Sequence, residues 1–281
     1  MIGPRISPHQ AMSGRRWPRI ASVAVMWAGA LLSTSCTAQL PDEETKAVTL
    51  LNKAGRLLEQ KRWQEAAEMA LQAEQLQRES YQVQQAAGQI LYLSGHSQQS
   101  LACFDRAVRI DPVRAPDNWQ RGIALASCGK FVESAAQFKT HHDVNPDDVE
   151  NSAWYFLCIA KTQGIEAARK TVIPSRGDSR EPMMSILRML KGEITPQAVL
   201  DTVADVERSG PRARFYADLY VGLYFDSLDQ PDEAIRFLKR SLQHGSEGYM
   251  VDTARVYLND RFAEAKADEQ KSEKPDNRNS D

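Results

Sequence analysis

The stretch RGIALASCGKFVESAAQF, residues Arg121–Phe138, decides the fold. Its pattern of small, apolar and polar residues predicts two short helices separated by a turn at Gly129, because glycine commonly stands just past a helix end. A second glycine, Gly122, lies inside the first helical run, where it costs about 1 kcal/mol relative to alanine. A residue that weakens its own helix in this way indicates a packing constraint, so we looked for the same pattern elsewhere in the chain.

Equivalents of Gly122 recur along the chain, and residues at fixed offsets from them recur as well. Ala54, Gly88 and Gly122 stand 34 residues apart, and each is followed by a small residue twelve positions later. The columns that follow the first one are Ala66, Ser100 and Ser134; Ala70, Phe104 and Phe138; Ala73, Ala107 and His141; and Arg78, Pro112 and Pro146. A fixed period of this length is typical of a stack of similar helical units.

The period and its columns resemble the tetratricopeptide repeat (TPR), a helix–turn–helix unit. The resemblance runs without a gap through residues 47–148 and implies an all-α, right-handed superhelical TPR solenoid. In such a unit two helices cross closely where a side chain is very small, so we expect Gly122 and Ser134 to mark such a crossing. Phe104 and Phe138 are expected to fill the space between successive units. Proline at the turn ends each unit because it cannot continue a helix.

Beyond residue 148 the register is lost and then returns. Residues 149–212 are interpreted as degenerate helical repeats, because apolar residues stay frequent between the prolines and glycines. Gly222 and, twelve positions on, Ala234 restore the pattern in residues 213–262. We expect this segment to form a TPR unit followed by a capping helix that shields the last exposed face. Residues 263–281 are charged and lack apolar anchors, which predicts a disordered tail.

Residues 1–36 have the layout of an export signal: basic residues, a 13-residue apolar run over Ile20–Leu32, and then small residues. The run is too short for a membrane-spanning helix. Translation could start at Met1 or at Met12. The first 35 residues hold four Arg and no acid, so Lys and Arg fall from 35 to 31 against 37 Asp and Glu, and the remainder carries −6.

Cys36, after small residues at the end of this leader, resembles the lipidated cysteine of bacterial lipoproteins. The resemblance implies a lipid on Cys36, a polar spacer over residues 37–46, and a protein that faces the periplasm from a membrane. Thr37, where an aspartate would act as a retention signal in that family, favours the outer membrane over the inner one. The chain departs from the family at Ser33, where leucine is preferred. The alternative is cleavage after Ala38, which would give a soluble periplasmic or secreted protein.

The sequence shows no catalytic, cofactor or metal motif. The formal net charge of −2 gives no basic field for nucleic acid. His141 and His142 are adjacent on the expected helix and point about 100° apart, so they share a metal poorly, and a position at a helix end explains them better. Cys103, Cys128 and Cys158 are interpreted as packing residues. We therefore expect a protein without catalytic activity.

A partner-binding groove is the remaining expectation, formed by the first helix of each unit as the family resemblance implies. Leu51 and Leu58 would begin its wall. Its candidate contact residues are Gln85, Gln89, Tyr92, Trp119, Ile123, Leu219 and Leu223. Tyr92 and Trp119 are the expected anchors, since aromatic residues dominate binding hot spots. The alternative for Trp119 is packing on the neighbouring unit. The lysine and asparagine set with which some TPR proteins grip a C-terminal carboxylate is missing.

The whole layout resembles bacterial lipoproteins of the NlpI type (new lipoprotein I). Two local stretches carry this likeness: the run Arg121–Leu125, and NPDD followed by Trp154 and Tyr155. The resemblance implies an envelope adaptor, often a homodimer, that recruits cell-wall (peptidoglycan) hydrolases and a protease.

Two other roles remain open. One is an assembly lipoprotein for an envelope secretion or pilus-type machine. The other is an enzyme with its site in residues 171–211. Arg176, Asp178, Arg180 and Glu181 are the charged residues there, and we interpret them as a solvated loop.

Overall fold

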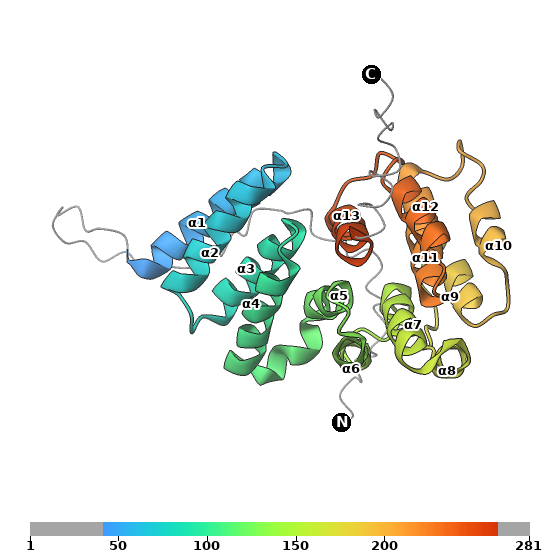
Figure 1. The fold of residues 1–281 in the computed structure, drawn as a ribbon, viewed down its shortest axis with the longest axis horizontal. Helices are drawn as coiled ribbons and strands as arrows, with labels where there is room; N and C mark the ends of the chain where they lie inside the picture. The colour runs from blue at the N-terminus through green and yellow to red at the C-terminus, as the bar shows by residue number, and fades with distance from the viewer. Residues whose placement is uncertain (1–41, 264–281) are drawn as a thin grey trace, which may run out of the picture.

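The computed structural model describes residues 42–263, and every regular element within that range is a helix (Figure 1). The first half consists of pairs of neighbouring helices that pack on each other. These are α1 (Glu43–Glu59) with α2 (Trp63–Leu76), α3 (Tyr81–Leu93) with α4 (Ser97–Ile110), and α5 (Trp119–Ser127) with α6 (Phe131–His142), a 3₁₀ helix η1 (Pro112–Asp117) preceding α5. The predicted all-α fold, a solenoid of packed helix pairs, is confirmed.

The second half consists of helices of more varied length, from 6 to 17 residues. They are α7 (Val149–Gln163), α8 (Ile165–Thr171), α9 (Met183–Leu190), α10 (Pro196–Asp201), α11 (Pro211–Ser227), α12 (Pro231–Ser241) and α13 (Tyr249–Arg261). Figure 1 shows the pairs following one another along an arc from α1 and α2 to α11 and α12, with α13 on the inner side. The proposed leader and lipidation site at Cys36 lie outside the described residues, as does the tail after residue 263.

The turns within the pairs share one helix-ending device. Lys61, Gly95, Gly129 and Asp229 all have a left-handed backbone, with φ of 59°, 84°, 73° and 55°. The N–H of the next residue reaches back to a carbonyl five positions earlier, as Lys130 N does to Leu125 O at 2.9 Å. This bond satisfies a helix-end carbonyl that would otherwise lack a partner. Glycine at two of these turns therefore has a conformational reason.

The glycine inside α5 has a different reason, which is the close approach of an aromatic ring. A Cβ atom on Gly122 would lie 2.8 Å from Cζ of Phe138, closer than real contacts allow. Ser134, on the facing helix, donates to the carbonyl of Gly122 at 2.8 Å. Gly88 meets the ring of Phe104 in the same way. The phenylalanine thus covers the glycine of its own unit, and Phe138 also stacks on Trp154 of α7, with ring centroids 6.3 Å apart.

The last helix, α13, reaches further than a cap would. It packs on α12 and also on α3 and α5, so it lies against the N-terminal half of the chain. Arg255 donates to the carbonyl of Leu93 at 2.6 Å, and the Tyr257 hydroxyl donates to Asp226 of α11 at 2.5 Å. The inner side of the arc is therefore filled by the chain itself, which a capping helix on the last unit would not do.

Candidate functional site

Most of the apolar residues expected to line an open groove are buried. Tyr92, Ile123, Leu219 and Leu223 are all at most 2% exposed. The Tyr92 hydroxyl shares a hydrogen bond of 2.9 Å with the Ser127 hydroxyl, which completes its burial. The expectation of an exposed apolar wall is corrected for these four residues. Tyr92 of α3 and Ile123 of α5 lie on helices that α13 packs against, and Leu219 and Leu223 lie on α11, which packs on α12 and α7.

The polar and aromatic candidates keep partial exposure. Gln85 and Asn118 exchange two amide hydrogen bonds, of 3.1 and 2.8 Å, across neighbouring units, and Gln89 is half-buried. Trp119, the first residue of α5, is also half-buried, and its ring meets Tyr249 of α13 edge-on at 4.9 Å between centroids. Trp119 therefore packs on another element and still reaches the surface, and its use as an anchor for a partner stays a prediction.

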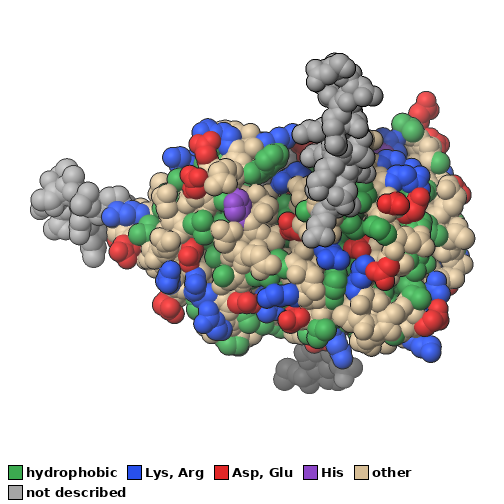
Figure 2. Space-filling model, in the orientation of Figure 1, with side chains coloured by type: hydrophobic (Ala, Val, Ile, Leu, Met, Phe, Trp, Pro, Cys, Tyr) green, Lys and Arg blue, Asp and Glu red, His purple; other side chains and the backbone are tan. Residues whose placement is uncertain are grey.

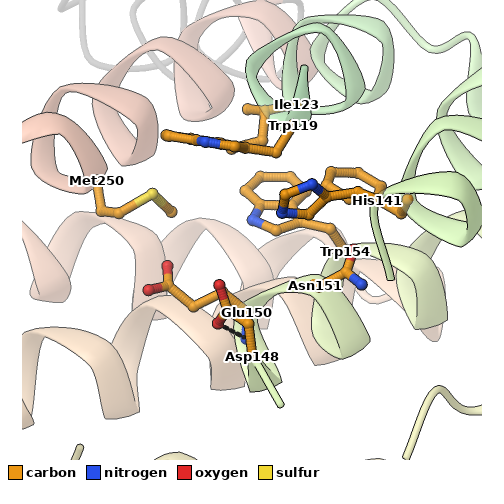
Figure 3. A pocket seen from close by; sticks show the side chains of 9 residues that line it. Trp119, Ile123, His141, Asp148, Glu150, Asn151, Trp154 and Met250 are labelled. Carbon is orange, nitrogen blue, oxygen red and sulfur yellow. Dashed lines mark hydrogen bonds between the residues drawn. The ribbon is translucent and has the colours of Figure 1, made fainter. Parts of the chain in front are cut away.

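A small pocket opens beside Trp119, between α5, α6, α7 and α13 (Figure 3). Its cavity of about 20 Å³ has room for one group the size of a water molecule. The side chains around it are Trp119, Ile123, Phe138, His141, Asp148, Glu150, Asn151, Trp154 and Met250. Figure 3 shows Trp119 and Trp154 facing a common space, with Met250 at one side and Glu150 below.

Two deeply buried residues of this lining have polar atoms without a hydrogen-bond partner in the part of the chain that the structure describes. Neither the nitrogen nor the oxygen of the Asn151 amide has one, although the residue is only 3% exposed. The indole nitrogen of Trp154, at 1% exposure, also lacks one. Unpaired buried polar groups are costly, so a site that keeps three such atoms around one cavity is suited to a polar guest.

An ionic cluster forms the floor of the pocket. Arg180 binds three carboxylates: Asp148 at 2.6 Å, Asp178 at 2.5 Å, and Glu150. The second oxygen of Glu150 accepts from the Tyr220 hydroxyl at 2.5 Å. The expectation of a solvated loop is wrong for Asp178 and Arg180, whose side chains are 6% and 25% exposed. The repeat pattern could not reveal this cluster, because its members come from α7, α11 and the segment between α8 and α9.

The remaining charges of that segment do face solvent. Arg176, 84% exposed, pairs with Asp147 at 2.8 Å, and Glu181 is exposed. The solvated interpretation therefore fits these two residues.

Burial has a strong effect on Glu150. Desolvation raises its pKa to about 7, the neighbouring Asp148 charge adds to the rise, and Arg180 and Tyr220 oppose it. The charge of Glu150 also affects Tyr216 of α11. Burial and this charge together raise the pKa of Tyr216 to about 12. The carboxyl in the pocket therefore changes charge near neutral pH.

His141, also in the lining of the pocket, is held by two contacts. Its Nδ1 lies 2.8 Å from the carbonyl of Pro116, and its Nε2 lies 3.5 Å from the amide nitrogen of Asn145. As predicted, His141 and His142 stand at the end of α6.

A second, more open cleft of about 380 Å³ lies where the turns of two pairs meet the end of α13. Its lining includes His96, Gln99, Cys128 and Asp260, and Ser97 donates to Asp260 at 2.6 Å. Burial raises the pKa of Cys128 to about 11, so its thiol is not an activated nucleophile. The cleft lacks the aromatic walls of the pocket at Trp119, which is therefore the stronger candidate site.

The outer surface offers no obvious alternative in the view of Figure 2, where acidic and basic side chains alternate and hydrophobic ones form small separate spots. Within residues 42–263 no helix has the length and apolar character to span a membrane. The same residues contain no group of three His, Cys, Asp or Glu side chains placed to hold a metal ion.

No protein-family model matches the chain, and no curated protein sequence matches it.

The sequence predicted Trp119 and Ile123 as site residues but not Glu150 and Asn151, which line the same pocket. Glu150 and Asn151 follow Asp148 at the start of α7, where acidic and polar residues ordinarily cap a helix, and Asp148 does so by accepting from Glu150 N at 3.0 Å. The missed signal is their position in VENSAWYFLCIA, a run otherwise dominated by small and apolar residues. A carboxyl and an amide inside such a run are expected to be buried, and buried polar groups point to a site.

Proposed function

We propose that the protein is a non-catalytic TPR scaffold of the bacterial envelope that binds partner proteins. The pocket at Trp119 and Trp154 carries this proposal, because its partly exposed aromatic wall and unpartnered buried polar atoms suit a side chain inserted by a partner. The register of the helix pairs supports the assignment as TPR units. The proposed setting is a lipid-anchored periplasmic protein held through Cys36, in the manner of NlpI-type lipoproteins.

The proposed role is recruitment of cell-wall hydrolases or a protease, with a homodimer as the proposed assembly. The alternatives that the sequence left open are different partners on the same surface. An assembly lipoprotein would contact components of a secretion or pilus-type machine. No cofactor, metal or nucleic acid takes part in the proposed activity, and the ionic cluster around Arg180 has a structural role.

Site-specific photo-crosslinking tests the proposal. A photoreactive benzoylphenylalanine replaces Trp119 in the full-length protein in cells, and a matched variant carries it at Val132, which is 68% exposed on α6. We expect discrete adducts from position 119 and none of the same mass from position 132. Identical adducts from both positions would contradict the pocket as the binding site, and the identity of the adducts separates recruitment from machine assembly.

Membrane attachment has its own test, detergent partitioning of the wild type and of Cys36→Ala. We expect the wild type in the detergent phase and the variant in the aqueous phase. Equal release of both would favour simple secretion.

A further inference from the structure

We propose that the pocket beside Trp119 takes the ammonium end of a lysine side chain presented by the partner. The inference rests on the proposed function, since it names the chemistry by which a partner is recognised. Three features support it: the charge of the lining, the aromatic walls and the size of the cavity.

The charge around the pocket is negative. Asp148 and Glu150 belong to the lining, which contains no Lys or Arg. These two carboxylates and Asp178 share the single guanidinium of Arg180, so the cluster is left with an excess of negative charge when Glu150 is ionised. An anionic guest would be repelled here, whereas a cation would be attracted in a poorly hydrated site.

The walls of the pocket also favour a cation. Trp119 and Trp154 come from different helices and face the same space (Figure 3). Tryptophan is the aromatic residue that attracts cations most strongly through its ring face. The oxygen of the buried Asn151 amide supplies an acceptor that has no hydrogen-bond partner among residues 42–263. An ammonium group has three donors and no acceptor, so it can bond the carboxylate, the amide oxygen and the ring faces, whereas the donors Asn151 Nδ2 and Trp154 Nε1 gain no partner from it.

The cavity size selects the kind of cation. About 20 Å³ holds one group of the size of water, and a primary ammonium is of that size. A planar guanidinium or a trimethylated ammonium is larger and would require Trp119 or Met250 to move. The four-carbon stem of lysine would then run past the half-buried Trp119 to the surface, along apolar wall.

Fluorine NMR of the full-length protein in detergent micelles, labelled with 5-fluorotryptophan, tests this inference. The probes are nonapeptides acetyl-GSGSXSGSG-amide in which X is lysine, norleucine or trimethyl-lysine; norleucine is the neutral counterpart. We expect the lysine peptide to shift the Trp119 and Trp154 resonances in a saturable manner. The resonance of Trp63, which lies outside the pocket lining, serves as internal control. The norleucine and trimethyl-lysine peptides should bind about tenfold more weakly or worse.

Two variants locate the effect. Glu150→Gln removes a carboxylate of the pocket lining and should lower the affinity for the lysine peptide about tenfold. Asp178→Asn removes a carboxylate of the same cluster that lies outside the lining, and it should change this affinity less than about threefold. Thermal melts confirm that both variants fold, and Trp119→Ala replaces Glu150→Gln if the latter does not.

Equal binding of lysine and norleucine, or no saturable shift with any peptide, overturns the lysine inference. Adducts from position 119 in the crosslinking experiment would then leave the scaffold function standing. Absence of those adducts would remove the function instead.

Discussion

The first three helix pairs and the segment from α7 to α10 are held together in different ways. In the pairs, small and large residues alternate across a crossing: Gly122 accommodates Phe138, and Ala54 stands where Gly122 does with Ala70 in place of the phenylalanine. Beyond α6, an ionic cluster around Arg180 is added to the apolar packing of α7 and α9. Packing between residues 16 apart leaves a period in the sequence, whereas contacts such as that of Glu150 with Tyr220, 70 residues apart, leave none.

The largest effect is expected from removing the cation of the ionic cluster. Arg180→Leu would leave three buried or partly buried carboxylates without their shared partner, and loss of one partner of a buried pair costs about 3–5 kcal/mol. Chemical denaturation measures the loss. The control is Arg176→Leu, whose ion pair with Asp147 is exposed and should cost less than about 1 kcal/mol. Similar losses in the two variants would show that the cluster does not hold the segment.

Overpacking a helix crossing should have the next largest effect. Gly122→Leu places a side chain where even a Cβ atom meets Phe138, and we expect a loss of about 3 kcal/mol. Gly55→Leu is the matched control, because nothing lies within 4 Å of a Cβ at that position of α1. Hydrogen exchange should show faster opening of α5 and α6 in the first variant alone. Comparable melts of the two variants would contradict the role of the glycine column.

Much of the fold could be predicted from the chain because its information is local and repeated. The glycine, serine and phenylalanine columns predict the crossing that Ser134 and Gly122 make. The left-handed turns were harder to predict from the sequence. Lys61 and Asp229 adopt the same positive φ as Gly95 and Gly129, but only glycine indicates this conformation by its residue type. The return of α13 onto α3 and α5 depends on the curvature of the whole arc, which no single unit encodes.

The candidate site could be predicted only in part for the same reason. Trp119 stands in a repeat and was found as an aromatic residue at an inward position. Asn151, Trp154 and Met250 reach the pocket from α7 and α13, and their meeting requires both the loss of register after α6 and the return of the last helix. A sequence pattern with a period of 34 residues predicts neither the loss of register nor the return of α13.

The ionic cluster, unlike the helix pairs, should also make the free energy of unfolding depend on pH. The pKa of Glu150 is about 7 in the folded protein and near 4.5 when unfolded, so the folded form binds the proton more tightly. The free energy of unfolding should therefore rise as the pH falls from 8 to 5. The upper limit of this rise is about 1.4 kcal/mol for each unit by which the two pKa values differ. Burial also raises the pKa of Asp252 and Asp260, so these two groups contribute with the same sign.

Denaturation curves of the wild type and Glu150→Gln at pH 5 and pH 8 measure this contribution. The variant should lose most of the difference between the two pH values. A wild type that is less stable at pH 5 than at pH 8, with the variant unchanged, would contradict a carboxyl held neutral by burial.

The smallest expected effect has opposite signs at two glycines of the regular pairs. Gly55 lies in the body of α1 with open space around a Cβ, so Gly55→Ala should raise the free energy of unfolding by about 0.5–1 kcal/mol through helix propensity. Gly129 has φ of 73° in the turn after α5, where alanine is strained, and Gly129→Ala should lower it by about 1 kcal/mol. Because neither substitution fills a crossing, both should leave α5 and α6 folded, in contrast to Gly122→Leu. Denaturation midpoints of the two alanine variants, measured at one pH, give the comparison. A stabilised Gly129→Ala variant would mean that the turn does not hold its left-handed conformation in solution, and the shared helix-ending device of the four turns would then be abandoned.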